Sequence, residues 1–430
     1  MSDRRSESDQ PPYRADEDWA RQADAEDPLS AFRTRFRIPR DDEGRALAYL
    51  CGNSLGLQPI EADTLVRQEL DEWARLAVDA HFAARTPWYT YQEQFREPGA
   101  RLVGGEPGEV VMMNSLTVNL HQMMVSFYRP TPQRHKILVE DCAFPSDRYA
   151  VQSQLGFHGY DPREGMLVAR SSDGAPSLRT ERLEELLHER GEEIALVLLG
   201  GVNYYTGQFF DLAKVTRAAR RQGCAVGLDL AHAAGNVPLE LHDWEVDFAV
   251  WCSYKYLNAG PGAVAGCFVH RRHGRRSDLP RFAGWWGNDP EQRFRVHLDS
   301  DFKPHTGADG WQLSNPPILA MAPLRASLDI FEEAGMIALR AKSERLTGYL
   351  QYLIDRTEDS SLEVLTPRTG GARGCQISLR VDDRPRERFQ SLQEQGVIGD
   401  FREPDVIRLA PVPLYNTFHD VWRAGRALGR

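Results

Sequence analysis

The sequence predicts an α/β protein, with a mostly parallel sheet covered by helices and a smaller α+β domain at the C-terminal end. Three observations support this prediction. Short apolar runs recur between residues 110 and 269, with amphipathic stretches between several of them, as in parallel sheets built from alternating strands and helices. The runs are nearly continuous, which is typical of strands buried on both faces. The pattern changes near residue 314, where a long helical region begins.

The elements are predicted in order along the chain. Residues 1–28 are charged and poor in large apolar side chains, which predicts a mobile arm. Apolar residues recur at helical spacing between 60 and 80. Strands are then expected at 110–113, 137–139, 166–169, 194–199, 225–230, 248–252 and 264–269, and helices at 117–128, 146–156, 179–190 and 212–222.

The C-terminal part has a different pattern. A helical region over 318–356 is interrupted near Gly335, and the elements after it are short. They comprise strands at 361–365, 375–381 and 405–410 and helices at 385–394 and 417–428. We therefore divide the chain into an arm (1–28), an N-terminal segment of the small domain that reaches the edge of the active site (29–60), a large domain (61–315), and a connecting helix with the small domain (316–430).

Composition excludes several classes of protein. The 430 residues are 41% hydrophobic and 27% charged, which is ordinary for a globular protein. A net charge of -10 argues against a general nucleic-acid binder. The six cysteines are scattered without metal-ligand spacing, so we expect small core residues in a reducing compartment and no metal. The sequence contains no apolar run that could span a bilayer and no apolar stretch after Met1, so we expect a cytoplasmic protein without a membrane partner.

Lys255 is the most informative residue. It lies between an apolar run ending at Cys252 and a turn containing Gly260 and Gly262. Apolar surroundings favour the neutral amine, which is a nucleophile and can hold an aldehyde cofactor as a Schiff base. A strand-end lysine that reaches the surface explains the same segment.

Asp229 ends another apolar run, one crossover unit before Lys255. Carboxyl ends of parallel strands meet at one edge, where ligands bind, and a carboxylate there can keep a pyridinium nitrogen of pyridoxal 5'-phosphate (PLP) protonated. Capping of the following turn is the alternative. Ser115 and Thr117 follow a third strand at a helix start that suits a phosphate, although simple capping explains them too. Phe144 follows a fourth strand and could stack on a flat ring or fill the core.

Motifs of other cofactor classes are missing from the sequence. It contains no Gly-x-Gly-x-x-Gly, Walker A or Gly-x-Ser-x-Gly motif, so binding of dinucleotides or nucleoside triphosphates and a nucleophile elbow lack support.

Taken together, these segments resemble the kynureninase family, PLP-dependent hydrolases of the aspartate aminotransferase-like fold, the PLP-dependent transferase fold type I. The matching runs occur in the family's order and cover residues 49 to about 420. They are Tyr49–Pro59, Phe144–Asp147, Tyr205–Gln208, Asp229–His232, Trp251–Gly260, Gly284–Gly287, Ser314–Leu319 and Ile407–Asn416.

The resemblance implies a role for each matching residue. Lys255 would carry PLP, Asp229 would face the pyridine nitrogen with His232 close by, and Phe144 would stack on the ring. Asp147 would help to hold the ring, and Leu116, Thr117 and Tyr254 would contact the phosphate. Trp285 and Asn315 would come from the neighbouring subunit, which implies a homodimer with shared sites.

Substrate contacts are implied in the same way. Arg408 would clamp the α-carboxylate, a task suited to a planar bidentate donor. Ser54, His81, Ser314 and Asn315 would line the substrate site, and a helix-end surface histidine is the alternative for His81. At Gly200 the chain departs from the family, which often has a hydroxyl residue there; backbone or water could replace this contact.

The implied reaction is hydrolysis of L-kynurenine to anthranilate and L-alanine, and of 3-hydroxy-L-kynurenine to 3-hydroxyanthranilate and L-alanine, in tryptophan degradation and NAD precursor metabolism. Lys255 would take the α-proton and return a proton at C4′ of the cofactor, and Tyr254 is a candidate donor of the last proton. The enzyme alternative is a cysteine desulfurase-like lyase, in which a histidine commonly precedes the lysine; here Tyr254 does. A catalytically inactive scaffold protein is a further alternative, and intact Lys255, Asp229 and Arg408 argue against it.

Overall fold

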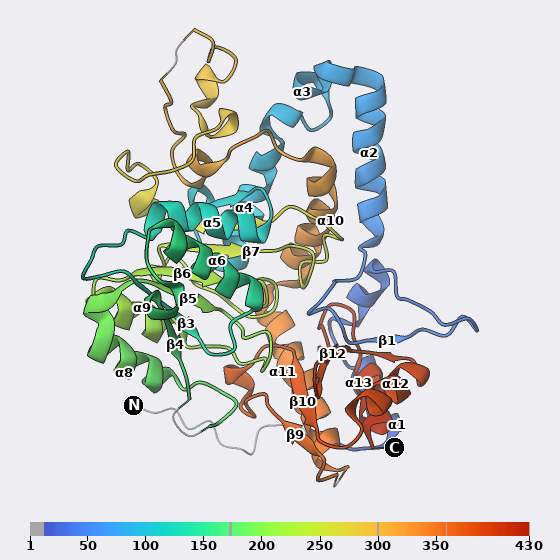
Figure 1. Ribbon diagram of the computed structural model, residues 1–430. Coiled ribbons are helices and arrows are strands. Elements are labelled where there is room, and N and C mark those ends of the chain that lie inside the picture. The colour runs from blue at the N-terminus through green and yellow to red at the C-terminus, as the bar shows by residue number, and fades with distance from the viewer. Residues whose placement is uncertain (1–12, 172–173, 299–300, 358, 430) are drawn as a thin grey trace.

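The computed structural model describes residues 13–171, 174–298, 301–357 and 359–429. Its larger part is built on a seven-stranded sheet with the order β2-β8-β7-β6-β5-β3-β4 (Figure 1). Strand β8 runs in the opposite direction to the other six strands. The strands are β2 (Val110–Met112), β3 (Lys136–Glu140), β4 (Met166–Ala169), β5 (Ile194–Gly200), β6 (Ala225–Asp229), β7 (Phe248–Trp251) and β8 (Gly266–Val269). The predicted strands and the mostly parallel sheet are confirmed.

Side chains of each central strand alternate between two cores, because successive residues point to opposite faces. In β5, Leu196 and Leu198 pack with residues of α5 (Leu116–Phe127) and α6 (Pro145–Phe157). Val197 and Leu199 pack with residues of α8 (Thr180–Arg190) and α9 (Leu212–Arg221). Burial on both faces explains why the strands are almost entirely apolar in sequence.

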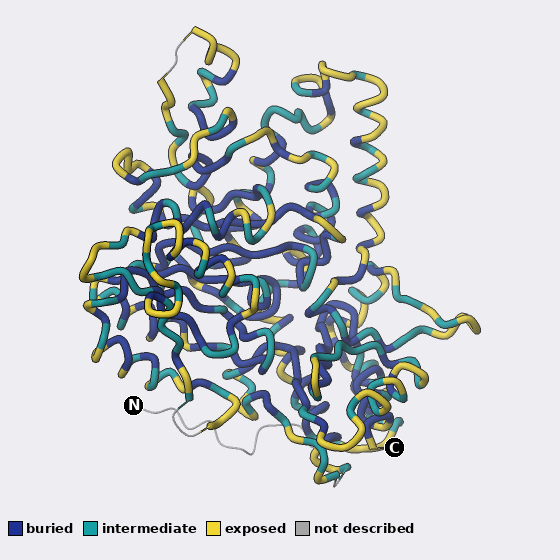
Figure 2. Tube along the Cα trace, in the orientation of Figure 1, coloured by how far each residue is buried: buried dark blue, intermediate teal, exposed yellow. Residues whose placement is uncertain are grey.

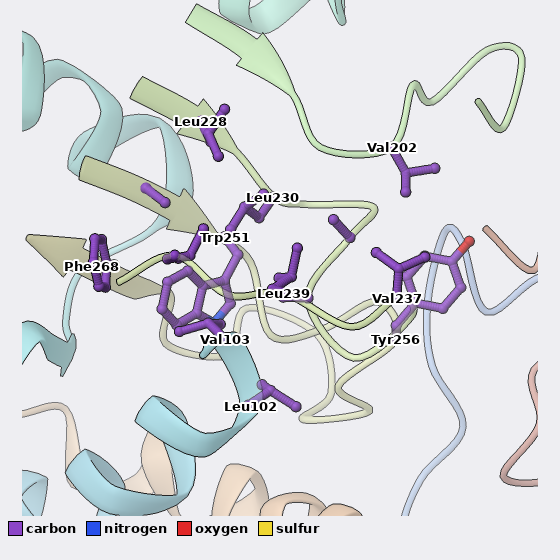
Figure 3. Packing of buried hydrophobic residues seen from close by; sticks show 14 of the residues in the cluster. Leu102, Val103, Val202, Leu228, Leu230, Val237, Leu239, Trp251, Tyr256 and Phe268 are labelled. Atoms are coloured by element: carbon purple, nitrogen blue, oxygen red, sulfur yellow. The ribbon is translucent and has the colours of Figure 1, made fainter. Parts of the chain in front are cut away.

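The end of β7 is fixed by close packing. Trp251 is fully buried and lies beside Val103 of α4 (Arg96–Val103), Leu239 and Phe268 (Figure 3). Gly266 on the neighbouring strand leaves room for the indole, since a Cβ there would lie 2.1 Å from Trp251 Cε2. The turn that follows Trp251 and carries Lys255 therefore starts from a rigid point.

A four-stranded antiparallel sheet, in the order β12-β13-β10-β9, forms the smaller part. Its strands are β9 (Leu362–Val364), β10 (Ile377–Val381), β12 (Asp400–Arg402) and β13 (Val406–Leu409). The helices α11 (Met336–Asp355), α12 (Pro385–Glu394) and α13 (Phe418–Leu428) pack in this part, whereas α10 (Ile318–Ala334), which precedes them, packs with the core of the larger part. The predicted helix break at Gly335 is confirmed, and Gly335 has a positive φ of 73°. The N-terminal strand β1 (Ala48–Tyr49) pairs with β11 (Val397–Ile398), which ties residues near 50 to this part.

The predicted mobile arm is wrong for its described residues. Residues 1–12 lie outside the described part of the chain, but α1 (Glu17–Ala25) packs against α13. The ring centroids of Trp19 and Tyr349 lie 4.6 Å apart, and Ala20 is fully buried. The alanines of this helix leave one face smooth enough for close packing, which a composition-based argument does not detect.

The upper edge of the molecule in Figure 1 is more exposed. Helix α2 (Ile60–Leu76) packs along α10 but remains largely exposed over its outer length (Figure 2). The short helix α3 (Ala80–Ala83) follows it, and the Phe82 ring lies 5.6 Å from the ring of Phe294. In the described part of the chain, no helix combines the length and the apolar character needed to cross a bilayer.

Candidate active site

Residues from the carboxyl ends of several parallel strands line one cavity at the edge of the large sheet. Glu140 ends β3, Gly200 ends β5 and Asp229 ends β6, while Lys255 follows β7. This edge is where α/β sheets bind ligands. The lining residues are Leu116, Thr117, Glu140, Phe144, Ser146, Asp147, Gly200, Val202, Tyr204, Asp229, Ala231, His232, Tyr254 and Lys255.

Lys255 points into this cavity between an imidazole and an aromatic ring. Its Nζ lies 3.0 Å from His232 Nε2 and 5.7 Å from the centroid of the Phe144 ring. Burial, and then the charge of Lys255, hold the pKa of His232 well below its usual range. His232 is therefore neutral, and its buried Nδ1 has no hydrogen-bond partner among the residues that the structure describes. The amine thus has a neutral neighbour that can exchange a hydrogen bond with it.

Three carboxyl groups share the same buried space. Burial raises the pKa of Asp229, and it raises the pKa of Glu140 to about 7. The pKa of Asp147 lies well above its usual value because of burial and the nearby Asp229 charge. Asp147 Oδ1 is buried without a partner. Holding all three as carboxylates without a cation is unfavourable, so the group is suited to a ligand that brings a positive charge or hydrogen-bond donors.

The amino terminus of α5 supplies the complementary anion site. The Ser115 side chain makes no hydrogen bond that caps the helix, so the first backbone N–H groups of α5 keep their capacity to bind an anion. The hydroxyls of Thr117 and Ser146 lie 3.2 Å apart beside this end. A phosphate site, an acidic group for a ring nitrogen and an amine for an aldehyde therefore line one cavity, and this donor set fits PLP.

The N-terminal segment fixes the turn that carries Lys255. Gly56 N donates a hydrogen bond of 2.8 Å to Tyr254 O. A Cβ at Gly56 would lie 2.2 Å from Lys255 O and 2.3 Å from Asn258 Oδ1, so only glycine fits this contact. Burial raises the pKa of Tyr254 far above its usual value, which keeps the phenol protonated as a hydrogen-bond donor.

Arg408 lies behind the cavity rather than in its lining. It is 1% exposed, its Nε donates to Asp400 Oδ1 at 2.8 Å, and its Nη1 donates to the Tyr204 carbonyl at 2.6 Å. The guanidinium carbon lies 5.9 Å from the centroid of the Tyr204 ring. A substrate carboxylate would have to compete with Asp400 for this guanidinium.

The structure does not bring the remaining predicted residues into this cavity. His81 and Asn315 line a separate cavity of about 450 Å³, together with Trp88 and Trp286. Trp285 is 42% exposed, and its Nε1 donates to Arg293 O at 2.6 Å. Ser54 lies in the loop before Gly56, and Ser314 is exposed next to Asn315; neither belongs to the lining of either cavity.

Sequence reasoning missed several lining residues, including Glu140 and Tyr204. From the sequence, Glu140 is expected at the end of a strand and Tyr204 in a loop. The signal available for Glu140 was a charged residue at the end of an otherwise apolar run. The carboxyl of Glu140 accepts the Gly200 N–H, at 3.1 Å from Oε1.

A group with metal-ligating side chains lies elsewhere in the structure. Glu109, His242 and His270 bring one ligand atom each within 4.8 Å of one another. The backbone N–H groups of Arg271 and Arg272 already donate to Glu109 Oε1 at 2.7 Å and to His270 Nδ1 at 3.2 Å. His242 Nδ1 lies 2.9 Å from Glu109 Oε1. The group is satisfied as a hydrogen-bond network that joins the end of β8 to the chain before β2.

Comparison with solved structures shows the fold. The complex of the cystine C-S lyase C-DES with its product cysteine persulfide has a TM-score of 0.75 and 19% identity, covering 89% of this chain and 97% of that one. A cysteine desulfurase from Escherichia coli also has a TM-score of 0.75, with 16% identity and coverage of 93% and 97%. The fold is thus that of the fold type I PLP-dependent enzymes, as the sequence predicted.

Sequence comparison is more specific. A model of the kynureninase C-terminal domain matches residues 339–428. The kynureninase of Myxococcus xanthus is 56% identical, with 96% of each chain covered, and that of Koribacter versatilis is 54% identical, with 95% of this chain and 96% of that one covered. The kynureninase of Flavobacterium psychrophilum is 50% identical, with coverage of 96% and 97%. The chain belongs to the kynureninase family.

Proposed function

We propose that this protein is a PLP-dependent enzyme that hydrolyses L-kynurenine to anthranilate and L-alanine, and 3-hydroxy-L-kynurenine to 3-hydroxyanthranilate and L-alanine. The observation that carries the proposal is the single cavity that holds Lys255, Asp229 and the amino terminus of α5 in a chain of this family. Bound through Lys255, PLP would supply an electron sink for bonds at the amino-acid carbon. The same family membership places the reaction in tryptophan degradation by the kynurenine pathway, which also leads to NAD precursors.

The protein's own groups have separate tasks. Asp229 would hold a proton on the ring nitrogen of the cofactor, with Asp147 and the neutral His232 beside it, and Phe144 would cover one ring face. Leu116 and Thr117, at the start of α5, would bind the phosphate together with Tyr254. Lys255 would remove the α-proton of the substrate and return a proton at C4′ of the cofactor, since its amine reaches into the cavity.

Two further groups would act on the substrate. Arg408 would bind the α-carboxylate after exchange with Asp400, a bidentate contact that a guanidinium makes well. Tyr254, kept protonated by burial, would donate the proton that completes alanine. Water would add to the γ-ketone before the Cβ–Cγ bond breaks.

We infer that the protein acts as a homodimer with shared sites. Two apolar segments support this inference: Phe82 on α3 and Phe294 contact each other, and both are more than half exposed. Exposed apolar surface of this kind marks protein interfaces. Trp285 and Asn315 lie in the same region, outside the cavity of their own chain, so they would complete the cavity of the partner, with His81, Ser54 and Ser314 at the substrate end.

Hybrid dimers test this inference. Lys255→Ala and Asn315→Ala are each expected to be nearly inactive alone. Random mixing of the two chains is expected to restore up to about one quarter of wild-type activity, because half of the dimers are hybrids with one complete site each. The measurement is anthranilate fluorescence after co-expression with two tags. Activity no higher than the mean of the two parent variants would contradict shared sites.

An assay with both substrates tests the activity and its preference. We expect anthranilate from L-kynurenine and a higher kcat/KM for 3-hydroxy-L-kynurenine, because polar groups such as His81 and Asn315 lose partners when the 3-hydroxyl is absent. His81→Leu is expected to reduce that preference by about 10-fold or more. A clear preference of the wild type for plain kynurenine would refute this part, and the absence of any anthranilate would refute the activity itself.

A cysteine desulfurase-like lyase is the second candidate, favoured by the fold similarity alone. Such a reaction needs a reactive cysteine near the cofactor. Among the described residues that line the cavity there is no cysteine, and burial raises the pKa of Cys142, the cysteine just before Phe144. Tyr254 rather than a histidine precedes Lys255. Sulfide release from L-cysteine is the assay that separates the two candidates.

We also propose a cytoplasmic location and the division into a PLP-binding large domain (61–315) and a small domain (316–430) that includes 29–60. The scattered, unpaired cysteines support the first. The pairing of β1 with β11 and the separate sheets support the second.

A further inference from the structure

Glu140 lies in the lining of the cavity, yet none of the tasks described above uses it. It ends β3 between Gly200 of β5 and the loop that leads to Phe144, and only 4% of it is exposed. Its carboxyl accepts the Gly200 N–H at 3.1 Å from Oε1 and 3.3 Å from Oε2. Gly200 in turn is the register partner of Asp229 on β6. Glu140 therefore lines the same cavity as Asp229, the carboxyl that would face the cofactor's ring.

Glu140 and a side chain at position 200 compete for the same space. A Cβ placed on Gly200 would lie 2.9 Å from Glu140 Oε1, closer than side-chain atoms normally approach. A side chain at position 200 would therefore require the Glu140 carboxyl to shift from its place beside the Gly200 N–H.

The charge state of Glu140 follows from its neighbours. Asp229 and Asp147 are the other carboxyls of the group, and a bound cofactor with one ring cation can balance only part of their charge. Burial and, to a smaller extent, the charge of Asp229 raise the pKa of Glu140 to about 7, although hydrogen bonds from the Glu140 and Gly200 backbone and from the Asn203 side chain act to lower it. A protonated Glu140 keeps one oxygen as the acceptor for Gly200 N–H and gains an O–H donor.

We propose that Glu140 is a cofactor-binding residue, whose protonated carboxyl donates a hydrogen bond to the bound PLP from the place where Gly200 offers no side chain. This inference rests on the proposed PLP site. It adds a contact that the sequence does not reveal, because Glu140 and Gly200 are 60 positions apart and meet only through the pairing of β3 with β5.

Reconstitution of the apoprotein with PLP tests the proposal, with the dissociation constant of PLP measured by absorbance titration. Glu140→Gln keeps an acceptor for Gly200 N–H and an N–H donor, so we expect an affinity within about 3-fold of wild type. Glu140→Ala removes the donor, so we expect an affinity that is roughly 10-fold to 100-fold weaker. Failure of the wild type itself to bind PLP would count against the proposed function, whereas differences among variants test Glu140.

A second substitution provides the decisive comparison. Gly200→Ser alone is expected to weaken PLP binding, because its Cβ crowds Glu140. In Glu140→Ala the space is vacant, so adding Gly200→Ser is expected to recover most of the lost affinity through the serine hydroxyl. If the double variant binds PLP no better than Glu140→Ala, or if Glu140→Ala binds as tightly as wild type, the proposal is overturned.

Thermal unfolding of the apoproteins separates binding from folding. We expect the Glu140→Ala apoprotein to unfold close to the wild-type temperature while its PLP affinity falls. Should this variant not fold, Glu140→Met replaces it, since methionine fills the space without a donor. The proposal then requires weak PLP binding by the methionine variant and near wild-type binding by the glutamine variant; equal affinities would overturn it.

Discussion

Replacement of Lys255 by alanine is expected to reduce kcat for kynurenine by at least about 10³-fold, since it removes both the nucleophile and the proton-transfer group. The Lys255 amine is positioned by the rigid end of β7 and by His232 Nε2 at 3.0 Å, so no other amine is expected to take its place. The measurement is the rate of anthranilate release under saturating PLP.

Mass spectrometry after borohydride reduction provides an independent measurement. The wild type is expected to gain the mass of reduced PLP on the peptide that contains Lys255, and Lys255→Ala is expected to gain none. Lys255→Arg is the matched control, because it keeps a positive charge beside His232 and Phe144 but does not form the bond. Substantial activity in Lys255→Ala, or labelling of a different lysine, would contradict the assigned role.

The repeating strands and helices of the large sheet could be predicted because burial on both faces leaves a strong apolar signal. β5 and β6 show this clearly, since each is an apolar run that ends at a residue of the cavity. The strands β1, β11 and β12 were missed because they are two or three residues long and carry no periodic pattern. The pairing of β1 with β11 also joins residues hundreds of positions apart, although β12 pairs with the nearby β13.

The candidate site could be predicted where its residues stand at the ends of apolar runs. Lys255 and Asp229 stand at ends of adjacent runs, so their meeting could be inferred from the order of strands and the rule for parallel sheets. No role could be assigned to Glu140 in this way, because the role that we propose depends on its contact with Gly200 on a different strand. His81 and Asn315 were predicted at the substrate site, but in the single chain they line a different cavity, so the role that we propose for them rests on the proposed homodimer.

Asp229→Asn is the second substitution for which we expect a large effect, a decrease in kcat/KM of about 10²-fold to 10⁴-fold. Asparagine keeps the shape of the side chain and an oxygen that can accept the Ala231 N–H, which lies 2.8 Å from Asp229 Oδ1. It cannot carry the negative charge that would keep the ring nitrogen protonated. The decrease in kcat/KM would therefore result from the missing negative charge rather than from a change in the shape of the side chain.

Although Asp229→Asn is expected to lower activity, it is not expected to lower the stability of the apoprotein. Burial raises the pKa of Asp229 in the folded state, so its contribution to stability is present below the unfolded pKa and is lost as pH rises through the folded value. At pH 8, the apoprotein of Asp229→Asn is thus expected to be at least as stable as the wild-type apoprotein, whereas PLP should stabilise the variant less because it binds more weakly. Thermal unfolding with and without PLP at pH 6 and pH 8 measures both effects. A variant that loses stability in the apo form and gains as much from PLP as the wild type would show that Asp229 supports the fold rather than the cofactor.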